Sequence, residues 1–183
     1  VETDPNANVG EVMKTLSEYM ADRVTTPVPQ AVASKTKQHI LDTLGAMVTG
    51  AALDPGQRAI AFAKALGGPA EASIPGTDLV VPVMHAAITN GMTAHADETD
   101  DSHSAGFWHP GCAVVPAALA LGERNQSSGQ ALIDAVALCY DVGSRVTMLL
   151  GAREFSSLGH KSTHNVGCNF GAHAACGVIA QFD

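Results

Sequence analysis

The stretch Pro110–Leu150, PGCAVVPAALALGERNQSSGQALIDAVALCYDVGSRVTMLL, decides the fold that we expect. Its first part, Pro110 to Glu123, is rich in Ala, Val and Leu and is predicted to be a helix. Ser127-Ser128-Gly129 ends this segment, and a long helix is predicted from Gln130 to Leu150. Small side chains let helices approach closely, so the stretch predicts a core of closely packed helices.

Helical patterns also cover most of the chain before and after this stretch. Residues 1–8 are predicted to be a disordered lead, and residues 9–183 to form one helical domain. Further helices are expected at 9–24, 31–49, 54–66 and 82–93, and a last one reaches the chain end after a loop from Gly151 to about Thr163. The one stretch typical of short extended structure is 72–82, with a turn at Pro75-Gly76. The expected fold class is therefore all-α.

The last helix, Asn169 to Phe182, has apolar and small residues on all sides. A helix of this kind is expected to be buried all round. Nothing follows it in the sequence, so we expect the covering surface to come from further residues or from a partner chain. The helical domain is accordingly expected to be incomplete.

Composition excludes several classes of partner. The net charge of −8 argues against nucleic acid or an anionic membrane as a partner. There is no run of 18 apolar residues, so no membrane span is predicted. The polar start of the chain lacks the order of a signal peptide. The four cysteines form no CxxC pair, so we interpret them as reduced thiols in a cytoplasmic protein.

A polar cluster precedes the helix at Pro110. The fifteen residues from His95 to His109 hold four carboxylates and three histidines, although charged residues make up only 15% of the chain. Concentrating titratable groups in one place raises the local charge repulsion. A sequence that does this despite the cost is expected to use these groups in a functional site. The alternative is a solvated acidic loop with incidental histidines.

Several motifs of this chain resemble the MmgE/PrpD family, which includes 2-methylcitrate dehydratase, cis-aconitate decarboxylase and iminodisuccinate epimerase. The segments that carry the resemblance are Ile40–Gly50, Asn90–His103, His109-Pro110-Gly111, Val115–Glu123, Cys139–Arg145 and the helix that includes Phe170-Gly171-Ala172. They cover nearly the whole chain in unbroken order, and together they are specific.

The resemblance implies a mostly helical domain whose pocket is closed by a smaller lid domain, which this chain lacks. It also implies a dimer, no cofactor, and chemistry at the carbon next to a carboxylate of a small di- or tricarboxylic acid. A proton is removed or added there, and the outcome is loss of water, loss of carbon dioxide or inversion. Family lysines that bind and protonate the substrate lie in the part that is absent here, so a second polypeptide is an expected partner.

The chemistry needs a base near its working pKa and donors for the substrate carboxylates. His109 matches the family histidine of His-Pro-Gly, and the helix that it precedes can hold an anion at its N-terminus. Glu98 stands where many members have Asp. His164 is preferred to His160 as the second catalytic histidine, although neither aligns without a small shift. The resemblance thus implies His109, His164 and Glu98 as catalytic residues.

The expected substrate-binding residues are Ser102, Asp101, His103, Lys161 and His160. Each also has a structural interpretation, such as a helix cap, a turn contact or an exposed side chain. Asp100 and Asp101 are adjacent, so one is expected to face the pocket while the other caps backbone N–H groups.

Two other functional classes stay open at this point. The chain can be a non-catalytic or half-site subunit that needs a second chain. A metal-dependent hydrolase using His160 and His164 is disfavoured by the absence of an HExxH glutamate, and no metal is expected. Association into a homo-oligomer is expected because Ala/Gly-rich helices in a small chain leave apolar surface uncovered.

Overall fold

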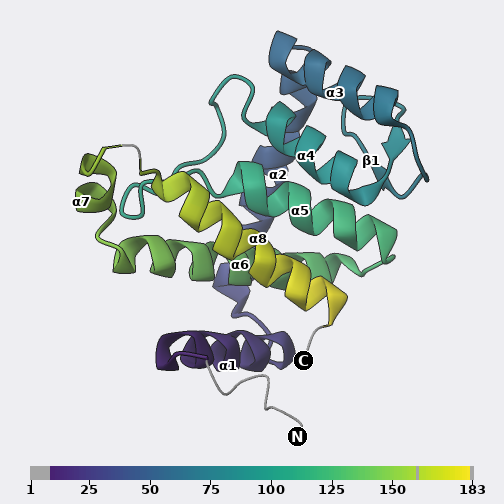
Figure 1. Cartoon of the computed structure of the whole chain (residues 1–183). Helices are drawn as coiled ribbons and strands as arrows, with labels where there is room; N and C mark the ends of the chain where they lie inside the picture. The colour runs from purple at the N-terminus through teal and green to yellow at the C-terminus, as the bar shows by residue number, and fades with distance from the viewer. Residues whose placement is uncertain (1–8, 160, 182–183) are drawn as a thin grey trace, which may run out of the picture.

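A computed structural model describes residues 9–159 and 161–181, and this part of the chain is mostly helical, with one short β-hairpin (Figure 1). Its elements are α1 (Glu11–Thr25), α2 (Gln30–Gly50), α3 (Asp54–Leu66), β1 (Ala72–Ser73), β2 (Val80–Val81), α4 (Val83–Ala94), α5 (Gly111–Arg124), α6 (Gly129–Leu149), α7 (Ala152–Ser157) and α8 (Thr163–Ala180). The all-α prediction is confirmed. The predicted disordered lead, residues 1–8, lies outside the described residues.

The main core lies where α5, α6 and α8 pack together, with α8 in front of α6 in Figure 1. The buried side chains here are mostly small or β-branched, and they include Val114, Val136, Val142 and Ala175. Side chains of this size allow the close helix approach that the sequence predicts.

A second apolar cluster joins α3 and α4 to the β-hairpin and to α5. Strands β1 and β2 pair antiparallel, with Ala72 opposite Val81. The turn at Pro75-Gly76 is present, and Gly76 has a φ of 83°, a left-handed conformation that glycine adopts without strain. Ile74 is fully buried beneath this turn.

The chain after Gly151 differs from the sequence prediction in one detail, and the last helix bears on the expected covering surface. The expected loop from Gly151 to Thr163 contains the short helix α7, which starts after Gly151 reverses the chain with a φ of 65°. Helix α8 buries only one face, because Gly167 and Gly171 pack inward while Asn169 and His173 are exposed. The chain by itself therefore leaves part of this helix uncovered, and its expected covering by further residues or a partner chain stays a prediction.

No helix among the described residues is long and apolar enough to cross a membrane. The four cysteines are free thiols, and Cys139 is fully buried.

Candidate active site

The polar cluster forms a loop that runs from the C-terminus of α4 to the start of α5. The backbone N–H of His103 donates to the carbonyl of Trp108 over 2.9 Å, and the N–H of Gly106 donates to His103 Nδ1 over 3.0 Å. These two bonds close the loop on itself. His103 therefore stabilises a turn, and its predicted contact with substrate stays a prediction.

Trp108 anchors this loop in the core. Its side chain is 1% exposed and lies against glycines of α6 and α8. A Cβ atom at Gly167 would lie 2.6 Å from Trp108 Cδ2, and one at Gly143 would also overlap the indole. Glycine at these positions gives the indole its space, and the buried indole positions His109, the next residue.

Asp101 binds the first turn of α5. Its Oδ1 accepts the N–H of Gly111 over 2.8 Å, and its Oδ2 accepts the hydroxyl of Tyr140 over 2.8 Å. His39 Nδ1 lies 2.8 Å from the same Oδ2. Burial and the Asp101 carboxylate raise the pKa of Tyr140, which keeps its hydroxyl protonated as the donor.

Asp101 is thus the residue of the adjacent pair that caps backbone N–H groups, as expected for one of the two. Both of its oxygens have protein partners, and it occupies the Gly111 N–H that a substrate carboxylate would otherwise contact at this helix N-terminus. A direct contact between Asp101 and substrate stays a prediction.

Tyr140→Phe is expected to lower the free energy of unfolding by about 1.5–3 kcal/mol, because Asp101 loses a buried donor to a charged acceptor. Urea unfolding followed by circular dichroism measures the loss. An unchanged unfolding midpoint would show that the Tyr140–Asp101 bond does not contribute to stability.

The candidate site lies where this loop meets the start of α8. The imidazoles of His109 and His164 stack with ring centroids 5.0 Å apart and an interplanar angle of 18°. His95 meets His109 edge-on, with centroids 5.3 Å apart. The Thr163 hydroxyl donates to the carbonyl of Phe107, which ties the first residue of α8 to the loop. Segments far apart in sequence therefore bring three imidazoles together.

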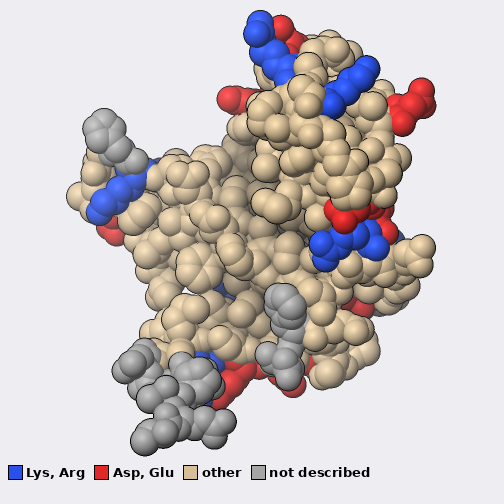
Figure 2. Space-filling model, turned by 45° about the vertical axis from the view of Figure 1, so that its right-hand side comes forward, with Lys and Arg blue, Asp and Glu red and all other residues tan. Residues whose placement is uncertain are grey.

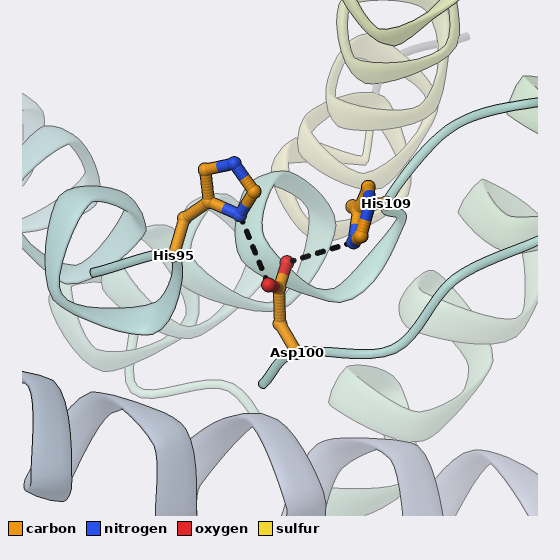
Figure 3. Close-up of side chains that lie close together, drawn as sticks. All are labelled: His95, Asp100 and His109. Carbon is orange, nitrogen blue, oxygen red and sulfur yellow. Dashed lines mark hydrogen bonds and ion pairs between the residues drawn. The ribbon is translucent and has the colours of Figure 1, made fainter. Parts of the chain in front are cut away.

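Asp100 lies between two of these imidazoles (Figure 3). Its Oδ1 lies 2.9 Å from His95 Nδ1, and its Oδ2 lies 3.6 Å from His109 Nδ1. The Asp100 side chain is fully buried. Asp100 is therefore the member of the adjacent pair that faces the candidate site.

Ligand atoms of His95, Asp100 and His109 all lie within 4.8 Å of one another, so this group has the composition of a metal site. An ionised carboxylate is an acceptor, however, and the imidazole N–H of His95 can pair with its Oδ1 without an ion. The chemistry of the donor set does not require a metal.

The electrostatics favour a neutral His164. Burial lowers its pKa from 6.5, and the neighbouring imidazoles of His109 and His95 lower it further. The carboxylates of Asp100 and Glu98 oppose this shift. A neutral imidazole at neutral pH has a free lone pair and is suited to act as a base.

Two thiols lie close to the backbone carbonyl of His109. Cys112 Sγ lies 3.4 Å from the His109 carbonyl oxygen, and Cys168 Sγ lies 4.0 Å from it. Burial is the main reason that the pKa of Cys112 lies far above its ordinary value and that the pKa of Cys168 rises to about 11. Both groups therefore stay protonated, which makes them weak donors and poor nucleophiles.

The other predicted site residues lie around this group. Glu98 is exposed, has a left-handed φ of 55°, and is close enough to influence His164. Ser102 is exposed on the same loop, and its contact with substrate stays a prediction. Lys161 is exposed, with its Nζ 5.4 Å from the ring centroid of Phe155. His160 lies outside the described residues.

Sequence reasoning missed the pairing of His95 with Asp100 and the contacts of Tyr140, His39, Cys112 and Cys168. The adjacent positions of Asp100 and Asp101 indicate that the two carboxylates point apart. They do not indicate which residues each carboxylate contacts. Tyr140 lies within a helical pattern, where a polar side chain of this size is indistinguishable from a core residue, and His95 lies at the end of the helix expected at 82–93.

The fold and this group of side chains define an all-helical domain with a histidine–carboxylate site. The family model for the MmgE/PrpD N-terminal domain matches residues 14–183, and the chain belongs to the MmgE/PrpD family. This is a family of dehydratase and isomerase type. No curated protein matches the chain.

Proposed function

We propose that this site transfers a proton at the carbon next to a carboxylate of a small di- or tricarboxylic acid, in a lyase or isomerase reaction. The observation that carries the proposal is the stacked pair of His109 and His164 over the buried Asp100 carboxylate. Two imidazoles at this spacing can act on one carbon, one as base and one as acid. Family membership supports the reaction class.

The first step requires one imidazole to accept the proton through its lone pair while nearby donors stabilise the charge that develops on the substrate. His164 suits the role of base because its surroundings favour the neutral form. His109 can then be the proton donor through Nε2 when its ring carries both protons, and it returns to the Nδ1–H form after the transfer. Glu98 and Ser102 lie on the same loop and can contact the substrate or His164.

Dehydration and epimerisation begin with removal of this proton, and decarboxylation ends with delivery of a proton to a carbon next to a remaining carboxylate, so all three transfer a proton at such a carbon. The test is therefore exchange of the substrate's α-hydrogen with solvent deuterium, followed by NMR, for 2-methylcitrate, cis-aconitate and iminodisuccinate. Exchange into at least one of these acids is expected. Absence of exchange for all three, in the chain and in its native assembly, would overturn the proposal.

A polycarboxylate needs more positive charge than the described part of the site supplies. The loop carries Glu98, Asp100 and Asp101, while Lys161 and Arg153 are cations on neighbouring segments, with Arg153 Cζ 5.0 Å from the ring centroid of Phe107. Figure 2 shows Lys and Arg side chains at the margins of the face that it displays. We therefore propose that a further domain or a second polypeptide contributes cations to the same site.

Mixing experiments test this part of the proposal. Activity is expected when the chain is combined with the protein that co-purifies with it, and the intact mass of the native assembly identifies that component. Full activity of the isolated chain would show that the described residues suffice. A chain that stays inactive in every assembly would support a non-catalytic subunit instead.

Self-association is proposed on the basis of exposed apolar side chains on α2, α3 and α4. Leu41 is 72% exposed, Met84 71% and Phe62 61%. Exposed side chains of this size favour a protein interface. Sedimentation equilibrium is expected to give a dimer, and a monomer at micromolar concentration would contradict this.

The pH dependence of His164 follows from its surroundings. Its pKa is lowered, so its NMR titration midpoint is expected below pH 6.5. The unfolded chain binds this proton first, so the His164 contribution to stability falls as pH decreases from about 6.5 toward the folded-state pKa. His164→Gln assigns the signal, and a midpoint above 6.5 would contradict the prediction.

Removal of metal ions is expected to leave the activity unchanged, since proton transfer here uses imidazoles. Dialysis against a chelator, with elemental analysis before and after, measures this. Loss of activity that zinc restores would favour a metal-dependent hydrolase at His95, Asp100 and His109.

A further inference from the structure

We propose that Asp100 is a positioning residue that holds His95 and His109 in the same tautomer. In this tautomer each ring carries its proton on Nδ1 and presents the lone pair of Nε2 away from the carboxylate. Only the kinetic consequence of this inference rests on the proposed function.

The carboxylate of Asp100 lies between the rings of His95 and His109. Each oxygen of Asp100 faces a different ring, at 2.9 Å from His95 Nδ1 and at 3.6 Å from His109 Nδ1 (Figure 3). An ionised carboxylate only accepts hydrogen bonds, so a ring nitrogen that pairs with it must carry the proton. The same buried group therefore selects the Nδ1–H form of both rings.

The facing atoms of Asp100 and His109 lack other partners among the described residues. Asp100 Oδ2 and His109 Nδ1 are both buried, and neither has a hydrogen-bond partner there. Leaving both atoms unpaired in a buried place is unfavourable, so pairing with each other is the arrangement that we expect. The distance of 3.6 Å is long for a hydrogen bond, and such catalytic contacts tighten when substrate is bound.

The contacts of neighbouring residues hold the Asp100 carboxylate in place. Asp101, the next residue, is fixed by Gly111 and Tyr140, and this orients the backbone of Asp100. The thiols of Cys112 and Cys168 and the imidazole of His164 also lie near Asp100, and Cys112 Sγ lies 3.4 Å from the His109 carbonyl oxygen, to which it can donate. A buried carboxylate held this firmly restrains both rings.

His95 has a role in this arrangement, although His95 itself is not needed for the proton transfer. His95 is 42% exposed, while Asp100 is fully buried. By donating to Oδ1, His95 compensates for the desolvation of the carboxylate and leaves Oδ2 for His109. It is thus a second positioning residue, which acts through Asp100.

The experiment is ¹⁵N NMR of the full chain labelled at histidine, without substrate and at a pH where the rings are neutral. His95→Gln and His109→Asn assign the two rings by the signals that they remove. Both rings of the unmodified protein are expected as Nδ1–H tautomers. An Nε2–H tautomer at either ring would overturn the proposal, and this result needs no Asp100 variant to fold.

Asp100→Asn provides the second test. A carboxamide has one acceptor oxygen where the carboxylate has two, so one of the two rings is expected to change tautomer. Where an exchanging acid has been found, kcat is expected to fall about 10- to 100-fold while KM stays within about twofold. Unchanged tautomers at both rings of a folded Asp100→Asn protein would overturn the proposal.

Asp97→Asn is the matched control. Asp97 is exposed on the same loop and its Oδ1 accepts the Thr99 hydroxyl over 2.8 Å, so its replacement is expected to leave both tautomers and kcat unchanged. The NMR result is independent of substrate. If no acid exchanges deuterium, the proposed function is contradicted. The tautomer assignment is then still tested by the NMR spectra alone.

Discussion

His109→Asn is expected to lower kcat for α-hydrogen exchange by about 100- to 10,000-fold while the protein stays folded. The imidazole of His109 stacks on His164 and faces Asp100, so it contributes to the candidate site from its centre. Asn keeps a polar side chain of similar reach but cannot transfer a proton. The rate of deuterium incorporation into the substrate measures the effect.

The control for this variant is His173→Asn. His173 is exposed on α8 and its Nδ1 contacts the carbonyl of Asn169, so its replacement is expected to leave the exchange rate unchanged. Circular dichroism confirms that both proteins are folded. Exchange at the normal rate in folded His109→Asn would remove His109 from the mechanism.

Trp108→Ala is expected to lower the free energy of unfolding by about 3–5 kcal/mol. The indole is 1% exposed and lies against glycines of two helices, which have no side chains to fill the space that it leaves. The cavity would therefore stay open between α6 and α8. Urea unfolding followed by circular dichroism is the measurement, because this variant removes the one tryptophan of the chain.

Phe62→Ala provides the comparison for an aromatic side chain outside the core. Phe62 is 61% exposed on α3, so its loss is expected to change stability by about 0.5 kcal/mol or less. Equal destabilisation by the two variants would show that the packing around Trp108 is not what stabilises the fold. Trp108→Ala is also expected to reduce activity, because His109 follows it directly.

The helices could be predicted because their signals are local. Apolar residues at helical spacing place α2 and α3 within one residue of their observed bounds, and Pro82 marks the start of α4. The short helix α7 was missed because six residues are too few for a periodic pattern. Its start depends on the left-handed Gly151, whose conformation the sequence does not specify.

The candidate site could be predicted only in part. The resemblance indicated His109 and His164, and the structure brings these two rings together. Sequence reasoning could not decide which of Asp100 and Asp101 faces the site, since both have the same chemistry and adjacent positions. That choice depends on where Tyr140 and His95 lie after folding.

The sequence by itself determined the helical class of this protein, its family, and the segment that holds its titratable groups. These properties depend on periodicity, composition and motifs, which are read along the chain. Tertiary structure alone decided that Asp101 caps α5, that Asp100 pairs with two imidazoles, and that Trp108 lies among glycines. These contacts join residues from different helices, so their partners are set by packing rather than by local propensity.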